Sequence, residues 1–482
     1  MPVLRGFSAS GLDRERGAGY SRFIMVTATR SKDTGKSTSR KRPARTYESA
    51  LKYLCTHTDY ERMRRVRYNA DTFNLDRMRD LLTRLGAPHE KLRAVHIAGT
   101  KGKGSTATML AEMLRAAGLR VGLYTSPHIT EIRERIRVNG TKVSQAAFAR
   151  LVCRAEPHIE KMADAKPTFF EIFTALAFAH FVDEDVDVAV VETGLGGRLD
   201  STNVLTPDVC GLTSVSLDHM HQLGTTLGEI AREKAGIFKP NVPAVSVPQA
   251  PEVQRVLQRA AREVGTELLL TTSPQMQFSY RVESSRQDGC HTRVCLTTAR
   301  SRFEHLPVPA TGEHQALNCG LAQLKARGFE IDDAKAVRGL AQVYLPGRME
   351  MIHNDPRVLV DGAHNAASVQ ALLRAIGQHI PYDSMVMVFG CAADKDIPGM
   401  MAELATGADK VIFTRARGNS RAADPAELAD AYEAATGRAG QVTGGAKEAL
   451  RVANSAISRE DLICTCGSFY LVGEAKELLA QA

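Results

Sequence analysis

Short apolar runs alternate with longer stretches of helical periodicity along most of this chain. The segments at 94–98 (AVHIA) and 186–191 (VDVAVV) are mainly apolar, which is typical of strands buried on both faces of a sheet. Residues 75–85 and 145–162 instead repeat apolar side chains every three or four positions, which predicts helices with one buried face. The alternation predicts an α/β fold with a mostly parallel sheet.

The pattern pauses at Pro346 and Gly347 and then starts again as a new series of strands and helices. We therefore predict two domains after a basic tail, with boundaries at 1–45, 46–345 and 346–482. The second domain is the smaller one and is expected to be doubly wound, because strands and helices alternate through it without a break.

Several local boundaries follow from the same pattern. Helical spacing predicts helices over 47–60 and 227–239. Short strands expected at 267–270, 278–282 and 292–296 are separated by polar turns, so we predict an antiparallel patch that covers one edge of the first domain.

Residues 94–107, AVHIAGTKGKGSTA, combine a buried strand, a glycine-rich loop and a helix. The loop can bring backbone N–H groups close to a phosphate, and a helix from Ser105 to Ala117 would direct its positive end at the same anion. The spacing departs from the usual G-x-x-x-x-G-K-[ST], because Gly104 separates Lys103 from Ser105. A glycine-rich turn with a solvated lysine is the alternative; the order of strand, loop and helix favours a phosphate-binding loop.

Two more polar segments follow predicted strands. Ser126 lies in the segment TSPH after a strand at 119–124, and Glu192 follows the buried run at 186–191 and precedes a glycine-rich segment. Ligands of open α/β sheets bind at the carboxyl ends of the strands, so we expect both residues near the phosphate loop. For Glu192 alone, a helix-capping or solvated carboxylate would explain the position equally well.

The net charge of +8 belongs to the first 45 residues, which hold eleven Lys and Arg against three Asp and Glu. The rest of the chain is neutral, which argues against a nucleic-acid-binding body. The tail is poor in apolar residues and is expected to be disordered; it could be a weak anion-binding arm, a transit-like segment or an over-extended start with Met25 as the true initiator. Nine cysteines without a C-x-x-C pair fit a reducing cytoplasm, and no apolar run reaches the length of a membrane span.

Ten motifs in order, spread over residues 46–480, resemble the dihydrofolate synthase/folylpolyglutamate synthase family of the Mur ligase superfamily. They are GTKGKGS at 99, TSPH at 125, TFFE at 168, ETGLGGRLDSTN at 192, SLDH at 216, REKAGIFK at 232, PGRME at 346, DGAHN at 361, ADKD at 393 and GSFYLVGE at 467. The resemblance implies an N-terminal P-loop ATPase domain joined to a Rossmann-like ligase domain.

The resemblance also implies a set of site residues. The ATP-binding set is Gly99, Thr100, Lys101, Gly102, Lys103, Gly104, Ser105, Asn318, Arg348, Asp361 and His364. The implied metal ligands are Ser126, Glu192, His219 and, once its amine is carbamylated, Lys234. Catalytic roles are implied for Lys103, His364 and Lys234. Without the resemblance, Lys234 would be a surface lysine and His219 an ordinary polar contact.

The candidate substrate pocket is Thr168, Phe169, Phe170 and Glu171, because the two aromatic rings can pack on a flat pterin. The alternative for aromatic residues at a helix start is a place in the core.

The implied reaction is an ATP-dependent ligation of L-glutamate to dihydropteroate or to a reduced folate through an acyl phosphate. The implied cofactors are ATP and two Mg²⁺ ions, with K⁺ or another monovalent cation as a further candidate. We expect a cytoplasmic monomer with small-molecule substrates and neither a nucleic acid nor a membrane as partner.

Two other functions share parts of this pattern. A Mur-type ligase acting on a cell-wall precursor would use the same ATP chemistry, but it normally carries an additional N-terminal domain, for which little chain precedes the loop. A P-loop nucleotide switch protein would not need the second domain with its DGAHN segment.

Overall fold

The structure is a computed structural model that describes residues 46–63, 68–162, 165–270, 276–285, 289–298, 302–308, 335, 338–339 and 343–481. The basic tail at 1–45 and Asn318 lie outside the described residues.

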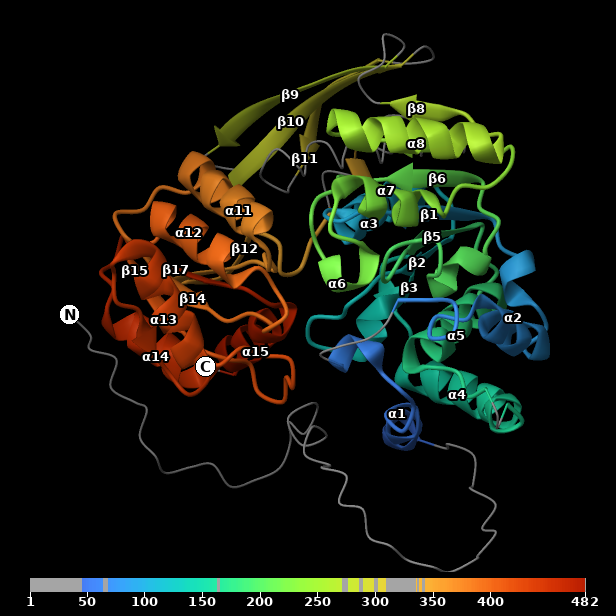
Figure 1. Cartoon of the computed structure of the whole chain (residues 1–482), viewed down its shortest axis with the longest axis horizontal. Helices are drawn as coiled ribbons and strands as arrows, with labels where there is room; N and C mark the ends of the chain where they lie inside the picture. Colours follow the sequence, from blue (N-terminus) through green and yellow to red (C-terminus); the bar gives the residue numbers. More distant parts are fainter. Residues whose placement is uncertain are drawn as a thin grey trace, which may run out of the picture. The chain divides into compact units, whose positions relative to one another are not determined.

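An eight-stranded sheet organises the first part of the chain (Figure 1). Across the sheet its strands are β4 (Thr141–Lys142), β3 (Ile136–Val138), β2 (Val121–Tyr124), β5 (Val188–Glu192), β1 (Ala94–Ala98), β6 (Val209–Leu212), β7 (Ala244–Ser246) and β8 (Leu268–Leu270). The six strands from β2 to β8 run parallel, whereas β3 and β4 form an antiparallel edge. The predicted mostly parallel sheet is confirmed.

Helices cover both faces of this sheet. They are α1 (Tyr47–Leu54), α2 (Leu75–Arg84), α3 (Lys103–Ala116), α4 (Gln145–Glu160), α5 (Phe169–Asp183), α6 (Met220–Leu223), α7 (Leu227–Ala235) and α8 (Pro251–Val264). Every residue of β1 and β5 is buried, which explains their nearly continuous apolar sequences. Alternate residues of β1 face different sides, because Val95 and Ile97 pack with α3 while Ala94 packs with α4 and α5.

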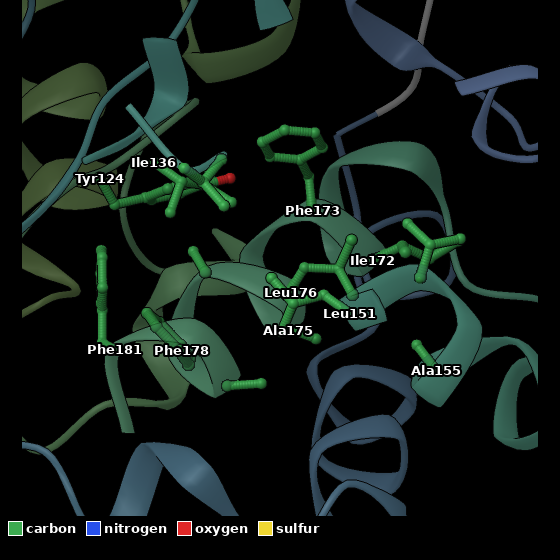
Figure 2. Packing of buried hydrophobic residues seen from close by; sticks show 14 of the residues in the cluster. Tyr124, Ile136, Leu151, Ala155, Ile172, Phe173, Ala175, Leu176, Phe178 and Phe181 are labelled. Atoms are coloured by element: carbon green, nitrogen blue, oxygen red, sulfur yellow. The ribbon is translucent and has the colours of Figure 1, made fainter. Parts of the chain in front are cut away.

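Helix α5 forms the largest apolar core of this part of the chain. Its side chains are buried almost all round, which suits a helix that lies between the sheet and other helices. Figure 2 shows side chains of α5, among them Phe173, Phe178 and Phe181, packed near Leu151 of α4 and Tyr124 of β2.

A separate six-stranded sheet organises the C-terminal part (orange and red in Figure 1). Its strands are β12 (Glu350–Asn354), β13 (Arg357–Val360), β17 (Leu462–Cys466), β14 (Met385–Phe389), β15 (Lys410–Phe413) and β16 (Gln441–Val442), and only β12 is antiparallel to its neighbour. The helices are α11 (Ala366–His379), α12 (Ile397–Gly407), α13 (Pro425–Thr436), α14 (Ala446–Ser455) and α15 (Phe469–Ala480). Met387 packs with α11, α12 and α13, whereas its neighbour Val388 packs with α14 and α15, so the sheet is doubly wound as predicted.

The antiparallel patch differs from the prediction in one strand. β9 (Met276–Ser285), β10 (Gly289–Thr298) and β11 (Arg302–Val308) form a three-stranded antiparallel sheet. The segment at 267–270 does not join it, because β8 pairs in parallel with β7 and completes the main sheet. Strand β12 was also missed, since its sequence EMIHN directly follows the predicted hinge.

Two predicted helices end earlier than their periodicity indicates. The first helix stops at Leu54 with Cys55 as its C-cap, and the N–H groups of Thr56 and His57 then donate to the carbonyls three residues back, at Tyr53 and Leu54. The helix predicted over 227–239 stops at Ala235, with Gly236 as its C-cap. The phosphate-loop helix begins two residues before the predicted Ser105, at Lys103.

We expect Phe178→Ala to lower the free energy of unfolding by about 3–5 kcal/mol, because the fully buried ring of α5 leaves a cavity in the core. Val442→Ala is the control: Val442 is 48% exposed on the edge strand β16, and its truncation should change stability by less than about 0.5 kcal/mol. Urea denaturation followed by circular dichroism measures both. Equal losses in the two variants would contradict the assignment of α5 to the core.

Candidate active site

The glycine-rich loop leaves β1 at its carboxyl end and is held tightly against β6. Gly99 has a φ of +150°, and a Cβ atom there would lie 1.7 Å from Oγ1 of Thr213, so only glycine fits. Thr100 fixes the next turn, because its N–H donates to the carbonyl of Ser214 at 2.8 Å. Gly102, with a φ of +78°, is the N-cap of α3 and provides no side-chain cap. The first N–H groups of α3 are therefore positioned to bind an anion.

Lys234 reaches the same loop from α7. Its Nζ donates to the carbonyl of Gly99 at 2.8 Å, and the residue is 3% exposed, so the surface-lysine alternative is wrong. Burial, together with the nearby charge of Lys103, lowers the pKa of Lys234 to about 7. A large share of this amine is consequently neutral near pH 7, unlike that of an ordinary lysine.

Glu192 and Ser126 lie together beside the loop. The N–H of Ser126 donates to Oε2 of Glu192 at 2.9 Å, and a Cβ atom at Gly104 would lie 3.2 Å from the same oxygen. Burial raises the pKa of Glu192, and the charge of Lys103 opposes that shift. Glu192 is the final residue of β5, where the prediction placed it just past the strand.

These two residues fit a magnesium ion only in combination with phosphate oxygens. No group of three His, Cys, Asp or Glu side chains suited to a metal is found in the described part of the chain. Mg²⁺, however, commonly takes one or two protein oxygens and completes its shell with substrate phosphates and water. The carboxylate of Glu192 and the hydroxyl of Ser126, next to the phosphate loop, match that requirement.

His219 adopts a left-handed backbone conformation, with a φ of 50°. Burial and then the charge of Lys395 lower the pKa of its imidazole to about 3, so the ring is neutral at physiological pH. A neutral ring nitrogen is the form that binds metals.

Asp218 connects this segment to the C-terminal sheet. Its Oδ1 accepts a hydrogen bond from Nζ of Lys395 at 2.7 Å, and its Oδ2 accepts one from Nδ2 of Asn365 at 3.1 Å. Nε2 of His364 lies 3.7 Å from the same Oδ2. Burial alone would raise the pKa of the Asp218 carboxyl, but its neighbours His219, His364 and Lys395 hold that pKa well below its usual range.

The predicted residues of the second domain lie at the carboxyl end of β13 and beside α15. The guanidinium of Arg348 stacks on the ring of Phe469 at 4.7 Å. Asp361 accepts hydrogen bonds from the N–H groups of Met349 at 2.9 Å and Ala363 at 2.8 Å, so its carboxylate also braces the surrounding loops. Burial raises the pKa of Asp361, and Arg348 opposes the shift.

The TFFE segment divides between the core and the cavity. Thr168 and Glu171 form a capping box at the start of α5, and Glu171 also binds Arg77 in an ion pair of 2.8 Å. Phe169 is 5% exposed and stacks on Phe173, so its ring belongs to the core. Phe170, in contrast, lines the cavity.

A cavity of about 550 Å³ brings the predicted residues together. Of those that the structure describes, all line it except Phe169: Gly99, Thr100, Lys101, Gly102, Lys103, Gly104, Ser105, Ser126, Thr168, Phe170, Glu171, Glu192, His219, Lys234, Arg348, Asp361 and His364.

The cavity is also lined by residues without a predicted role. Among them are Tyr60, Phe73, Arg77, Asp218, Asn365, Lys395, Asn419, Arg421 and Ser468. Asp218 and Lys395 belong to the motifs SLDH and ADKD, so the sequence did signal them, but without indicating that they pair. Tyr60 and Phe73 carry no motif, and only the fold brings their rings to 5.3 Å from each other.

Comparisons with known proteins agree with this geometry. The model of the Mur ligase middle domain matches residues 97–325, and that of the Mur ligase glutamate ligase domain matches residues 347–469. The fold and the site therefore define the chain as a Mur-type ligase.

Relatives and solved structures narrow the class. Dihydrofolate synthase/folylpolyglutamate synthase of Bacillus subtilis is 34% identical over 415 residues, covering 84% of this chain and 94% of its own. A Mycobacterium tuberculosis folylpolyglutamate synthase complexed with ADP and AMPPCP superposes with a TM-score of 0.79 at 32% identity, over 85% of this chain and 96% of that chain. Escherichia coli FolC in complex with DHPP and ADP also gives a TM-score of 0.79, at 30% identity over 91% and 99% of the two chains.

The chain belongs to the dihydrofolate synthase/folylpolyglutamate synthase family, a family of acid–amino-acid ligases. It spans about half the length of one relative, a probable bifunctional folylpolyglutamate synthase/dihydropteroate synthase of Haloferax volcanii, to which it is 37% identical over 411 residues, 84% of this chain and 48% of that one.

We expect Lys103→Ala to lower turnover by about 10²–10³-fold, the usual loss when one group that stabilises transition-state charge is removed. The melting temperature should stay within about 2 °C, because Lys103 opens α3 with its side chain at the cavity and outside the core. Lys161→Ala, at the exposed C-cap of α4, is the control. A Lys103→Ala variant with turnover within tenfold of the parent would contradict the phosphate-binding assignment.

Proposed function

We propose that this protein joins L-glutamate to dihydropteroate, to a folyl(poly)glutamate, or to both, and consumes ATP to do so. The observation that carries the proposal is that one cavity brings the phosphate loop together with His364, Arg348 and Lys395 of the C-terminal part. The relatives and solved structures named above support the substrate class.

In the first proposed step, a carboxylate of the pteroate or folate attacks the γ-phosphate of ATP and forms an acyl phosphate, with ADP as the leaving group. Lys103 and the N–H groups that open α3 would hold the β- and γ-phosphates. This arrangement neutralises charge and orients the transferred group, which are the main contributions a protein makes to phosphoryl transfer.

In the second step, the neutral amine of L-glutamate attacks the acyl carbon, and phosphate leaves from the tetrahedral intermediate as the amide bond forms. We propose that His364 and Arg348 face this intermediate from the C-terminal domain. Domain closure about 344–347 would keep water away from the acyl phosphate, as mobile lids commonly do.

We propose that Ser126, Glu192 and His219 hold magnesium together with the phosphates, and that Lys234 holds a second ion as a carbamate. Magnesium, when bound, supplies positive charge against the phosphate oxygens. The buried amine of Lys234, with its lowered pKa, suits carbamate formation, which requires a neutral amine. A carbamate keeps one N–H, so the hydrogen bond to the Gly99 carbonyl can persist. The use of K⁺ or another monovalent cation as a further cofactor stays a prediction.

The aromatic side of the cavity is the proposed place of the pterin. Phe170, Tyr60 and Phe73 line it, and their rings offer faces to a flat heterocycle. Because the ring of Phe169 lies in the core, we assign the pterin contact to Phe170 and retain Thr168 and Glu171 as residues of the pocket wall.

We further propose two domains, residues 46–345 and 346–482, each built on its own sheet. We also propose a monomer as the active form. We also propose that the protein acts in the cytoplasm on small-molecule substrates, with neither a nucleic acid nor a membrane as partner. Within the described residues, every helix falls short of the length or apolar character that a membrane crossing requires.

We expect ADP formation by the purified protein, given ATP, Mg²⁺ and L-glutamate, to require dihydropteroate or tetrahydrofolate, offered in parallel reactions. Mass spectrometry of the products should show the addition of one glutamate to at least one of the two. ATP hydrolysis at the same rate without any pteridine or L-glutamate would instead support a nucleotide switch protein, and transfer to a cell-wall precursor alone would support a Mur-type function.

We expect Lys234→Ala to lower turnover by about 10²-fold or more, and formate or acetate to restore part of it. Alanine leaves a space beside Gly99 into which a small carboxylate can enter and replace the carbamate oxygens. The same acids added to Lys103→Ala should restore nothing. Parental turnover of Lys234→Ala without any additive would contradict the carbamate.

A further inference from the structure

A glycine in α15 permits an unusually close approach between the two parts of the chain. Gly473 is buried in the second turn of the helix, and a Cβ atom there would lie 2.2 Å from the carbonyl oxygen of Ile129 and 3.1 Å from its carbonyl carbon. Both atoms are backbone, so no side-chain rotation can relieve the contact. Any other residue at 473 would displace the segment that contains Ile129.

Ile129 is fixed to the C-terminal part by its side chain as well. Although it follows β2 in the chain, it packs against the core cluster that includes Val360 and Val472. A Cβ atom at Gly347, in the connection between the two sheets, would lie 3.0 Å from Cδ1 of Ile129. The C-terminal part thus holds Ile129 on two sides.

The segment around Ile129 leads directly to the proposed magnesium ligands. Glu134 accepts hydrogen bonds from the N–H groups of Ile129 at 2.9 Å and Glu131 at 2.9 Å, so this end of the loop is braced. Three residues before Ile129, the N–H of Ser126 binds Glu192. Because Ser126 and Ile129 are so close in the chain, a displacement of Ile129 is expected to move Ser126 as well.

We propose that Gly473 is a positioning residue for the reaction: by receiving the Ile129 carbonyl, it aligns Ser126 with Glu192 when the C-terminal part is in place. The inference rests on the proposed function of Ser126 as a magnesium ligand. It explains a glycine inside a helix, where alanine would ordinarily be more stable.

The test compares Gly473→Ala with Gly377→Ala in the full chain. Gly377 also lies inside a helix, α11, but a Cβ atom there meets nothing within 4 Å. Replacement of glycine by alanine raises the intrinsic helix propensity equally at the two positions. Because nothing obstructs a Cβ atom at 377, Gly377→Ala should keep parental turnover and an unchanged or slightly higher melting temperature. Gly473→Ala should lose about 10²-fold in turnover, the usual effect of a displacement of about 1 Å at a reacting centre.

Hydrogen exchange of residues 125–131 supplies a readout that is independent of turnover. It should be faster in Gly473→Ala than in Gly377→Ala, and the Mg²⁺ concentration for half-maximal turnover should rise. Ile129→Ala, which removes the apolar anchor without adding a clash, should show both effects more weakly and provides the test if Gly473→Ala does not fold.

The outcomes distinguish the positioning role of Gly473 from the proposed role of Ser126 as a magnesium ligand. Parental exchange in this loop for both Gly473→Ala and Ile129→Ala would overturn the role of Gly473. Faster exchange with an unchanged Mg²⁺ requirement would support that role and contradict Ser126 as a metal ligand.

Discussion

The parallel pairing of β1 with β5 and β6 is the constraint on which the site depends. Ile97 lies opposite Glu192, and Ala98 lies opposite Leu212, so the chain leaves these three strands at one edge of the sheet. The phosphate loop, the carboxylate of Glu192 and the segment after β6 must therefore converge, although about 90 residues separate the loop from Glu192. Convergence at the carboxyl ends of parallel strands is general for open α/β sheets, and here glycines allow backbone to approach within contact distance.

The cavity lining carries slightly more Lys and Arg than Asp and Glu side chains, and two of its lysines, Lys101 and Lys234, are largely removed from water. Burial lowers the pKa of Lys101 to about 8 and that of Lys234 to about 7, because removal from water disfavours their charged form. A nucleotide triphosphate is the kind of ligand that would compensate such a site. Asp218 meanwhile draws Lys395 and Asn365 toward the segment SLDH, so the contact between the two parts of the chain uses the same electrostatics as the site.

Much of the fold could be predicted because local and global requirements agree. The segments predicted at 94–98, 75–85 and 145–162 form β1, α2 and α4 with ends that differ by two residues at most, since buried strands and amphipathic helices impose their period on the sequence. The errors fall where the local signal is weak. Strand β8 has only three residues, which is too short a pattern to distinguish a parallel edge strand from a strand of the antiparallel patch. Strand β12 mixes apolar with charged and polar residues and follows a Pro–Gly pair, so it lacks a clear strand pattern.

The sequence by itself determined the phosphate loop, the order of the motifs and the family resemblance, because glycines, lysines and carboxylates at fixed local spacing carry that information. The tertiary structure alone decided which side of each element faces the cavity. It assigned the ring of Phe169 to the core and that of Phe170 to the cavity, although the two are adjacent. It also buried Lys234 and placed Gly473 against Ile129, because the environment of a side chain depends on residues distant in the chain, which no local pattern records.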